Sequence, residues 1–170
     1  MDIRIDSNGE HFKFRVCGIL AHENKFLFVK IANNPFYCLP GGHAEIGEDT
    51  ETAAKREMAE ELGFPIKIKK LTSIAQNLFK NAKNEIVHEL SFYYIVEAEN
   101  PADLNQNDYE LQECDKGVMK TLQFKWLTKE QIQQIDCRPN FAIKILCPDK
   151  VLHIINKYNE VVTADEFTAE

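Results

Sequence analysis

Three glutamates, Glu57, Glu60 and Glu61, have the spacing in this sequence that most directly suggests chemistry. Residues at i, i+3 and i+4 project from one face of an α-helix, so a helix here places the three carboxylates side by side. Like charges at this spacing destabilise an isolated helix. A divalent cation removes that penalty, because carboxylate oxygens are natural ligands of Mg²⁺ and Mn²⁺. The spacing therefore suggests metal-dependent chemistry.

The neighbouring residues could complete such a site around a diphosphate. Mg²⁺ keeps several waters and typically bridges carboxylates to substrate phosphates, so metals on this face could neutralise a diphosphate and activate an attacking water. Arg56 adjoins the acidic face and can brace a carboxylate through two hydrogen bonds, with Glu48 as a candidate partner. The Gly41–Gly42 pair lets the backbone turn sharply, and the Gly41 carbonyl could supply a further metal ligand.

A solvent-exposed helix face is the commoner explanation for three such glutamates alone, since Glu is a frequent surface residue. The wider pattern favours a site, because the sequence fits G-x5-E-x7-R-E-U-x-E-E-x-G-U, where U is apolar. The matching residues are Gly42, Glu48, Arg56, Glu57, Met58, Glu60, Glu61, Gly63 and Phe64. This segment resembles the signature of the Nudix hydrolase family, the Nudix box.

The resemblance implies a fold, an activity and a set of site residues. Nudix domains are α/β/α sandwiches with a mixed central β-sheet. They hydrolyse nucleoside diphosphates linked to another moiety by water attack at phosphorus, usually with Mg²⁺ or Mn²⁺ as cofactor. The implied catalytic residues are Glu48, Arg56, Glu57 and Glu60, and the implied metal ligands are Gly41, Glu57, Glu60 and Glu61. Glu57 is also a candidate for activating the water.

Some family members take the base from a loop after the box, for which Glu110 and Glu113 are the candidates here. The downstream Pro that marks ADP-ribose pyrophosphatases is absent, since this region reads Asn-Leu-Phe-Lys at residues 77–80. The marks of dinucleoside polyphosphate hydrolases and of NADH-cleaving enzymes are also missing, so the exact substrate stays open. The candidates for substrate binding are Arg15, Phe36, Phe79 and Glu113.

The elements that position these residues follow from apolar periodicity. Strands are expected at residues 12–20, 25–31, 36–39, 66–74, 86–96 and 122–127. A helix is expected from Asp49 to Leu62, because Ala54, Met58 and Leu62 recur every four residues before the stop signal of Gly63. Asp49 or Thr50 is a suitable N-cap.

The remaining segments are less regular. Residues 98–116 are polar and are expected to form a long surface loop. A short helix is expected after Thr128 and another over residues 140–146. We expect residues 1–147 to form the Nudix domain and residues 148–170 a C-terminal extension that packs on it or trails from it.

Charge and cysteine usage restrict the class of protein. The formal charge of −7 weakens any case for broad nucleic-acid binding but leaves room for a small nucleotide diphosphate derivative bridged by cations. The sequence has no secretory signal and no apolar run long enough to cross a bilayer. Its five scattered cysteines lack a CxxC pair, so a zinc site has no support and a cytoplasmic location is expected. Family members of this size are often homodimers.

Two other functions remain open. One is a non-catalytic Nudix module that senses nucleotides or binds a partner, which the complete set of glutamates disfavours. The other is an isomerase of the isopentenyl diphosphate type, another activity of this fold, for which Cys38 and Glu89 would be the nearest candidates. Turnover of a broad panel of nucleotides would distinguish hydrolysis from sensing.

Overall fold

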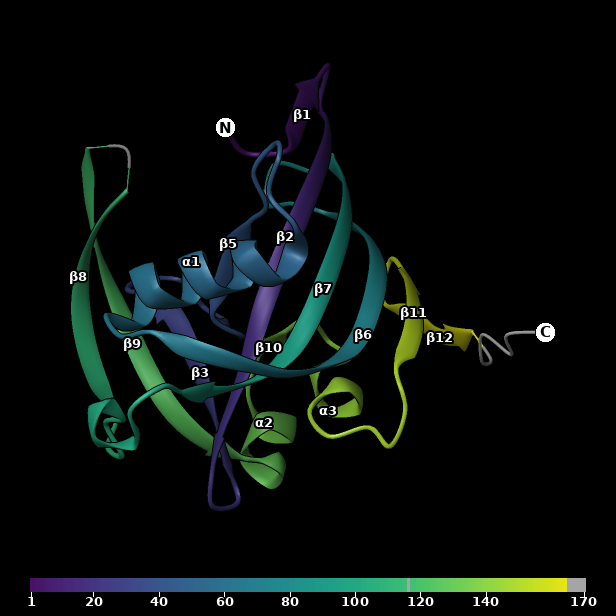
Figure 1. Ribbon diagram of the computed structural model, residues 1–170. Helices are drawn as coiled ribbons and strands as arrows, with labels where there is room; N and C mark the ends of the chain where they lie inside the picture. Colours follow the sequence, from purple (N-terminus) through teal and green to yellow (C-terminus); the bar gives the residue numbers. More distant parts are fainter. Residues whose placement is uncertain (116, 165–170) are drawn as a thin grey trace.

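The apolar stretches of the sequence form a mixed β-sheet in the computed structural model, which describes residues 1–115 and 117–164 (Figure 1). The strands are β1 (Arg4–Ser7), β2 (Glu10–His22), β3 (Lys25–Ile31), β4 (Tyr37–Cys38), β5 (Gly41–His43), β6 (Ile66–Lys80), β7 (Ile86–Ala98), β8 (Tyr109–Asp115), β9 (Val118–Thr128), β10 (Cys137–Arg138), β11 (Leu152–Lys157) and β12 (Glu160–Ala164). The helices are α1 (Thr50–Leu62), α2 (Lys129–Gln134), α3 (Ala142–Ile145) and the 3-10 turn η1 (Pro101–Asp103). The predicted longer strands all lie within these elements.

The sheet divides at β2. Over residues 10–20, β2 pairs in parallel with β7, whereas it pairs with β3 only at Ala21 and His22. Within the first of these stretches, residues 15–17 of β2 also pair antiparallel with β5. The backbone N–H of Gly18 also donates to the carbonyl of Pro40 at 3.0 Å. The Gly41–Gly42 turn is therefore fixed against the middle of the central strand.

Further strands extend the sheet on both sides of this division (Figure 1). On one side β3 pairs with β9, and β9 pairs with the edge strand β8. On the other side β7 continues through β6 to β11 and β12. The pairs β2–β7, β6–β11 and β4–β10 are parallel and the remaining pairs are antiparallel, so the sheet is mixed as predicted.

Helix α1 has clear signals at both ends. The Asp49 side chain accepts the backbone N–H groups of Glu51 and Thr52 at 3.0 and 2.9 Å, which satisfies two donors of the first turn. Gly63 ends the helix with φ of 80°, a left-handed conformation that suits glycine. Met58 packs so closely on Gly18 that a Cβ there would lie 2.5 Å from its sulfur. This contact fixes α1 on β2 and leaves Glu57 and Glu61 beside the Gly41–Gly42 turn.

Apolar side chains cover both faces of the sheet. Val16 and Leu20 of β2 pack in the cluster that contains the buried face of α1. Cys17 and Ile19, which alternate with them, pack with Phe141 and Ile145 around α3 on the other face. The alternation along one strand thus builds two cores, and the architecture is the predicted α/β/α sandwich with a mixed central sheet.

The prediction of a loop over residues 98–116 is wrong in part, because Tyr109–Asp115 forms β8 and pairs with β9. In this strand Tyr109 and Leu111 are half-buried while Glu110 and Gln112 are exposed. Such alternation marks an edge strand with one face on the core. The polar composition of its outer face concealed the strand from sequence reasoning.

The end of the chain also joins the sheet. Strand β11 pairs in parallel with β6, from Leu152 opposite Ser73 to Lys157 opposite Leu78, and β12 folds back on β11. The predicted division at residue 147 stays a prediction, and residues 165–170 of the proposed extension lie outside the described residues. Within residues 1–115 and 117–164, no helix is long and apolar enough to cross a membrane.

Candidate active site

Arg56 organises the acidic face of α1. Its Nε and one terminal nitrogen each lie 2.9 Å from an oxygen of Glu48, which forms a bidentate pair. The other terminal nitrogen donates to Glu57 Oε1 at 2.8 Å, and the guanidinium also reaches the carbonyl of His43 at 3.0 Å. The hydrogen bond from Arg56 lowers the pKa of Glu48. Arg56 and Glu48 therefore form the brace expected from the sequence, and it ties α1 to β5.

Glu57 lies directly against the glycine turn. A Cβ added to Gly42 would lie 1.9 Å from Glu57 Oε2, so this approach requires glycine at residue 42. Burial raises the pKa of Glu57, while the hydrogen bond from Arg56 opposes that rise. Oε2 has no hydrogen-bond donor among the described residues, which leaves it available to a cation or a water.

Glu61 and Glu60 occupy contrasting surroundings. Glu61 Oε2 accepts the backbone N–H of Gly41 at 2.8 Å. Burial raises the pKa of Glu61 to about 8, against the opposing effects of the Gly41 hydrogen bond and the charge of Arg15. Glu60 is exposed, with Oε2 3.6 Å from Arg56. One helix face therefore presents Glu57 braced by Arg56, Glu60 exposed to solvent and Glu61 half-buried against the glycine turn.

The candidate ligand atoms of this site fit a hard divalent cation. They are carboxylate and carbonyl oxygens, the ligands preferred by Mg²⁺ and Mn²⁺ rather than by zinc. In the described part of the chain, no three His, Cys, Asp or Glu side chains already form a cage for a metal ion. Mg²⁺ does not require one, because it usually retains waters and bridges few carboxylates to substrate phosphates. Glu57, Glu60 and Glu61 remain the candidate ligands.

The Gly41 carbonyl, also a candidate ligand, accepts a hydrogen bond from a terminal nitrogen of Arg15 at 2.8 Å. A carbonyl oxygen has two lone pairs, so this bond leaves one for a metal ion. Arg15 is therefore brought to the candidate site, but its observed contact is with the glycine turn.

The two candidate bases, Glu110 and Glu113, both lie on the edge strand β8 but point to opposite faces of it. Glu110 is exposed and accepts from Gln123 at 2.6 Å across the outer face of the hairpin. Glu113 is half-buried, and its charge contributes to the raised pKa of Glu61. Because side chains alternate along a strand, Glu113 shares the inner face with Tyr109 and Leu111. The fold turns Glu113 and Glu110 to opposite faces of β8, and of the two only Glu113 contributes to the raised pKa of Glu61.

The two aromatic candidates lie at different places. Phe36 precedes β4, and the Arg138 guanidinium lies 5.6 Å from the centre of its ring. Phe79 on β6 lies opposite Val87, whereas Ser91 of β7 lies opposite Arg15. Four strand residues, or about 13 Å, therefore separate the level of Phe79 from that of Arg15. Phe79 therefore lies well along the sheet from Arg15 and the glycine turn, and the described contact of the Phe36 ring is with Arg138.

Several polar residues on β6, β7 and β11 are buried, which the sequence did not indicate, although Glu89 was named as a candidate for the isomerase alternative. Glu89 is only 8% exposed and accepts from Ser91 Oγ at 3.0 Å. Asn77 and Asn156 form a buried amide pair at 2.6 Å. On an amphipathic strand, polar residues at alternate positions normally indicate a solvated face, so the pattern gave no signal that this face is buried.

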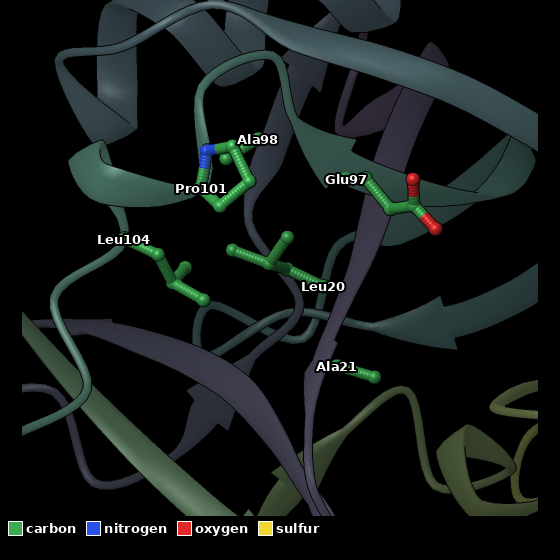
Figure 2. Close-up of a pocket in the computed structure, with 6 residues that line it drawn as sticks. All are labelled: Leu20, Ala21, Glu97, Ala98, Pro101 and Leu104. Atoms are coloured by element: carbon green, nitrogen blue, oxygen red, sulfur yellow. The ribbon is translucent and has the colours of Figure 1, made fainter.

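A separate hollow of about 160 Å³ lies at the ends of β2 and β7 (Figure 2). Its lining residues are Leu20, Ala21, Glu97, Ala98, Pro101 and Leu104. It is smaller than the roughly 300–1,000 Å³ of typical ligand pockets, and none of the Nudix-box residues lines it. Glu97 pairs with Lys69 at 3.2 Å. We assign the hollow no role in the site.

Comparison with known proteins decides the family. A family model of the NUDIX domain matches residues 11–146. The chain belongs to the Nudix family. Among curated proteins, it is 36% identical over 80 residues to an ADP-ribose pyrophosphatase of Methanocaldococcus jannaschii, covering 45% of this chain and 47% of that protein. It is 35% identical over 63 residues to a MutT-like protein of Streptomyces ambofaciens, covering 36% and 41%. The match thus spans less than half of either relative.

Solved Nudix structures share the fold. The mutator MutT protein from Bacillus halodurans superposes with a TM-score of 0.62 at 17% identity, covering 91% of this chain and 99% of that one. An ADP-ribose pyrophosphatase from Streptococcus suis gives 0.52 at 13% identity, covering 85% and 98%. At these identities the similarity concerns the fold alone.

Proposed function

We propose that this Nudix protein is a hydrolase that uses Mg²⁺ or Mn²⁺ to cleave the diphosphate linkage of a nucleoside diphosphate derivative. The observation that carries the proposal is the complete Nudix box folded as one unit. Glu57, Glu60 and Glu61 share one face of α1, and the glycine turn lies against that face. A module without catalysis has no chemical need for this arrangement.

The reaction would consume one water. Its oxygen forms a bond to phosphorus, the bond from phosphorus to the bridging oxygen breaks, and the departing phosphate keeps the bridging oxygen. The bound cation would neutralise the diphosphate and lower the pKa of the attacking water. Arg56 holds Glu57 in place, and either Glu57 or Glu113 accepts the proton of the water.

The substrate is a nucleoside triphosphate or a nucleotide conjugate. The curated relatives include an ADP-ribose pyrophosphatase and a MutT-like protein. The Pro expected of ADP-ribose pyrophosphatases is absent from residues 77–80, which argues against ADP-ribose and names no other substrate. A small-molecule panel that contains both classes decides between them.

The test is turnover of such a panel with Mg²⁺. Nucleoside triphosphates, nucleotide sugars, dinucleotides and ADP-ribose are incubated with the protein, and release of phosphate or monophosphate is measured. We expect Glu60→Gln and Glu61→Gln to lose most activity while remaining folded, since each removes a candidate ligand charge. Glu51→Gln, on the exposed first turn of α1, is the matched control and should retain activity. Nucleotide binding without turnover would instead support the sensing module.

A further inference from the structure

The Gly41 peptide is held from both of its polar groups. Its N–H donates to Glu61 Oε2 at 2.8 Å, and its carbonyl accepts from Arg15 at 2.8 Å. Its φ of +141° favours glycine, and a Cβ there would lie 2.1 Å from the backbone oxygen of Val16. Gly41 thus links Arg15 on β2 to Glu61 on α1 through its two successive peptide groups.

Arg15 is itself supported from β7. Its second terminal nitrogen lies 3.9 Å from Glu89 Oε2, and the other oxygen of Glu89 accepts from Ser91 Oγ at 3.0 Å. Ser91 lies directly opposite Arg15 in the parallel ladder, and Glu89 lies opposite Lys13. Ser91 is fully buried, and the carboxylate of Glu89 is nearly so. A chain of contacts therefore runs from Ser91 through Glu89 and Arg15 to the glycine turn.

Folding stability alone does not explain this chain of contacts. The Glu89 carboxylate is almost fully removed from water and the Arg15 side chain is 26% exposed, so the pair carries a partial desolvation cost, and apolar replacements of such pairs are often as stable or more stable. Arg15 Nε is also buried without a hydrogen-bond partner among the described residues, which adds to the cost. A sequence selected for stability alone would gain from an apolar pair here.

We propose that Arg15, supported by Glu89 and Ser91, is a positioning residue that fixes the Gly41 peptide and thereby holds Glu61 ready for the divalent cation. This inference rests on the proposed function, because Glu61 is taken as a metal ligand. It differs from the expectation that Arg15 contacts substrate phosphates. A phosphate contact would change the affinity for substrate and leave the affinity for the cation in the absence of substrate unchanged.

The experiment compares Arg15→Met, Arg15→Lys, Glu89→Gln and the double variant Arg15→Met/Glu89→Leu. Mn²⁺ affinity is measured by electron paramagnetic resonance without substrate, and the Gly41 amide resonance is followed by NMR in metal-free protein. Lys69→Met is the matched control, because Lys69 pairs with Glu97 at 3.2 Å across the neighbouring strands β6 and β7, away from the glycine turn.

We expect Arg15→Met to weaken Mn²⁺ binding by roughly 10–100-fold, the usual cost of losing a residue that orients a ligand. It should also shift the Gly41 amide resonance. Arg15→Lys should recover part of both effects, since one ammonium donor can still reach the carbonyl. The double variant should unfold at or above the wild-type temperature and still bind Mn²⁺ weakly, which separates positioning from stability. The control should match the wild type in both readouts.

Wild-type Mn²⁺ affinity and an unmoved Gly41 resonance in the folded double variant would overturn the proposal. A raised KM for the diphosphate with unchanged Mn²⁺ affinity would also overturn it and make Arg15 a phosphate contact. Failure of the proposed function gives a different result, in which wild-type protein neither binds Mn²⁺ nor turns over the panel. In that case the Gly41 resonance of the metal-free variants still decides whether Arg15 fixes the turn.

Discussion

At the scale of single residues, the candidate site depends on close approaches that only particular side chains permit. Glu57 lies against Gly42, Glu61 accepts from the Gly41 peptide, and Arg56 binds Glu48 and Glu57 together. Carboxylates in contact with a fixed backbone are already oriented before a cation arrives. This preorganisation is what a catalytic centre requires.

Replacing Gly42 by alanine should damage the candidate site while leaving the fold almost as stable. The new methyl group would meet the end of the flexible Glu57 side chain, which can move aside, so we expect a stability loss within about 1 kcal/mol. The displaced carboxylate should weaken Mn²⁺ binding and turnover strongly.

Gly41→Ala provides the contrast, since its Cβ would meet backbone atoms and its φ is positive. We expect that variant to lose roughly 3 kcal/mol. Thermal denaturation and Mn²⁺ titration of both variants check the pair, and equal stability losses would contradict the structure.

Arg56→Lys tests the brace. A lysine keeps the charge but cannot span both oxygens of Glu48 while donating to Glu57, so turnover should fall roughly 10–100-fold. Lys55→Arg, at the exposed neighbouring position, should leave kcat/KM unchanged. A fully active Arg56→Lys enzyme would show that charge alone suffices.

At the scale of elements, the hairpin of β8 and β9 determines which late glutamate can reach the chemistry. Its alternation turns Tyr109, Leu111 and Glu113 inward and Glu110 outward. The inner face of the hairpin packs on the core cluster that contains α1. Glu113 lies on this face, and its charge acts on Glu61.

Glu113→Gln should consequently lower kcat by about 100-fold or more if Glu113 accepts the proton from water. Glu110→Gln changes the same residue type in the same strand and should keep kcat within about twofold of the wild type, because exposed substitutions have small effects. Steady-state kinetics on the best substrate of the panel measure both. Equal rates in the two variants would leave Glu57 as the base.

The contact between β1 and β2 makes the stability of the fold depend on pH, without involving the candidate site. His11 on β2 lies 2.6 Å from Asp6 on β1 and 3.1 Å from Glu85 beside β7. These hydrogen bonds, with Asp6 contributing most, raise the pKa of His11 above its usual 6.5. The protonated form is therefore favoured by folding. Its stabilisation is complete below the unfolded pKa and is lost as the pH rises through the higher folded value.

NMR titration of His11 should accordingly give a midpoint above 6.5. The thermal stability of wild type relative to His11→Asn should decline as the pH rises through that midpoint. A midpoint below 6.5, or a stability difference that grows with pH, would contradict the three-residue cluster.

At the scale of the whole molecule, the sequence predicted the helix that carries the Nudix box, but it did not predict every contact that this helix and its neighbours make. The spacing of Glu57, Glu60 and Glu61 and the capping residues Asp49 and Gly63 are local signals, and the structure reproduces the helix within a residue of the expected bounds. Regular periodicity predicts such elements well because their geometry depends on neighbouring residues.

The parts that the sequence did not predict depend on contacts between distant segments. Strand β8 looked like a polar loop, since half of its side chains face solvent. The contact of Arg15 with Gly41 joins residues 26 positions apart, and that of Arg15 with Glu89 requires the parallel pairing of β2 and β7. Spacing within one segment contains no information about such pairings.

The most direct test of the central claim is the fate of isotopically labelled water. The substrate selected from the panel is hydrolysed with Mg²⁺ in H₂¹⁸O, and the products are followed by ³¹P NMR. We predict two phosphorus-containing products with ¹⁸O bonded to phosphorus in one of them, no reaction after chelation of the metal, and loss of most of the rate in Glu61→Gln. Cleavage that persists without divalent metal, or that continues at the wild-type rate in Glu61→Gln, would contradict the account.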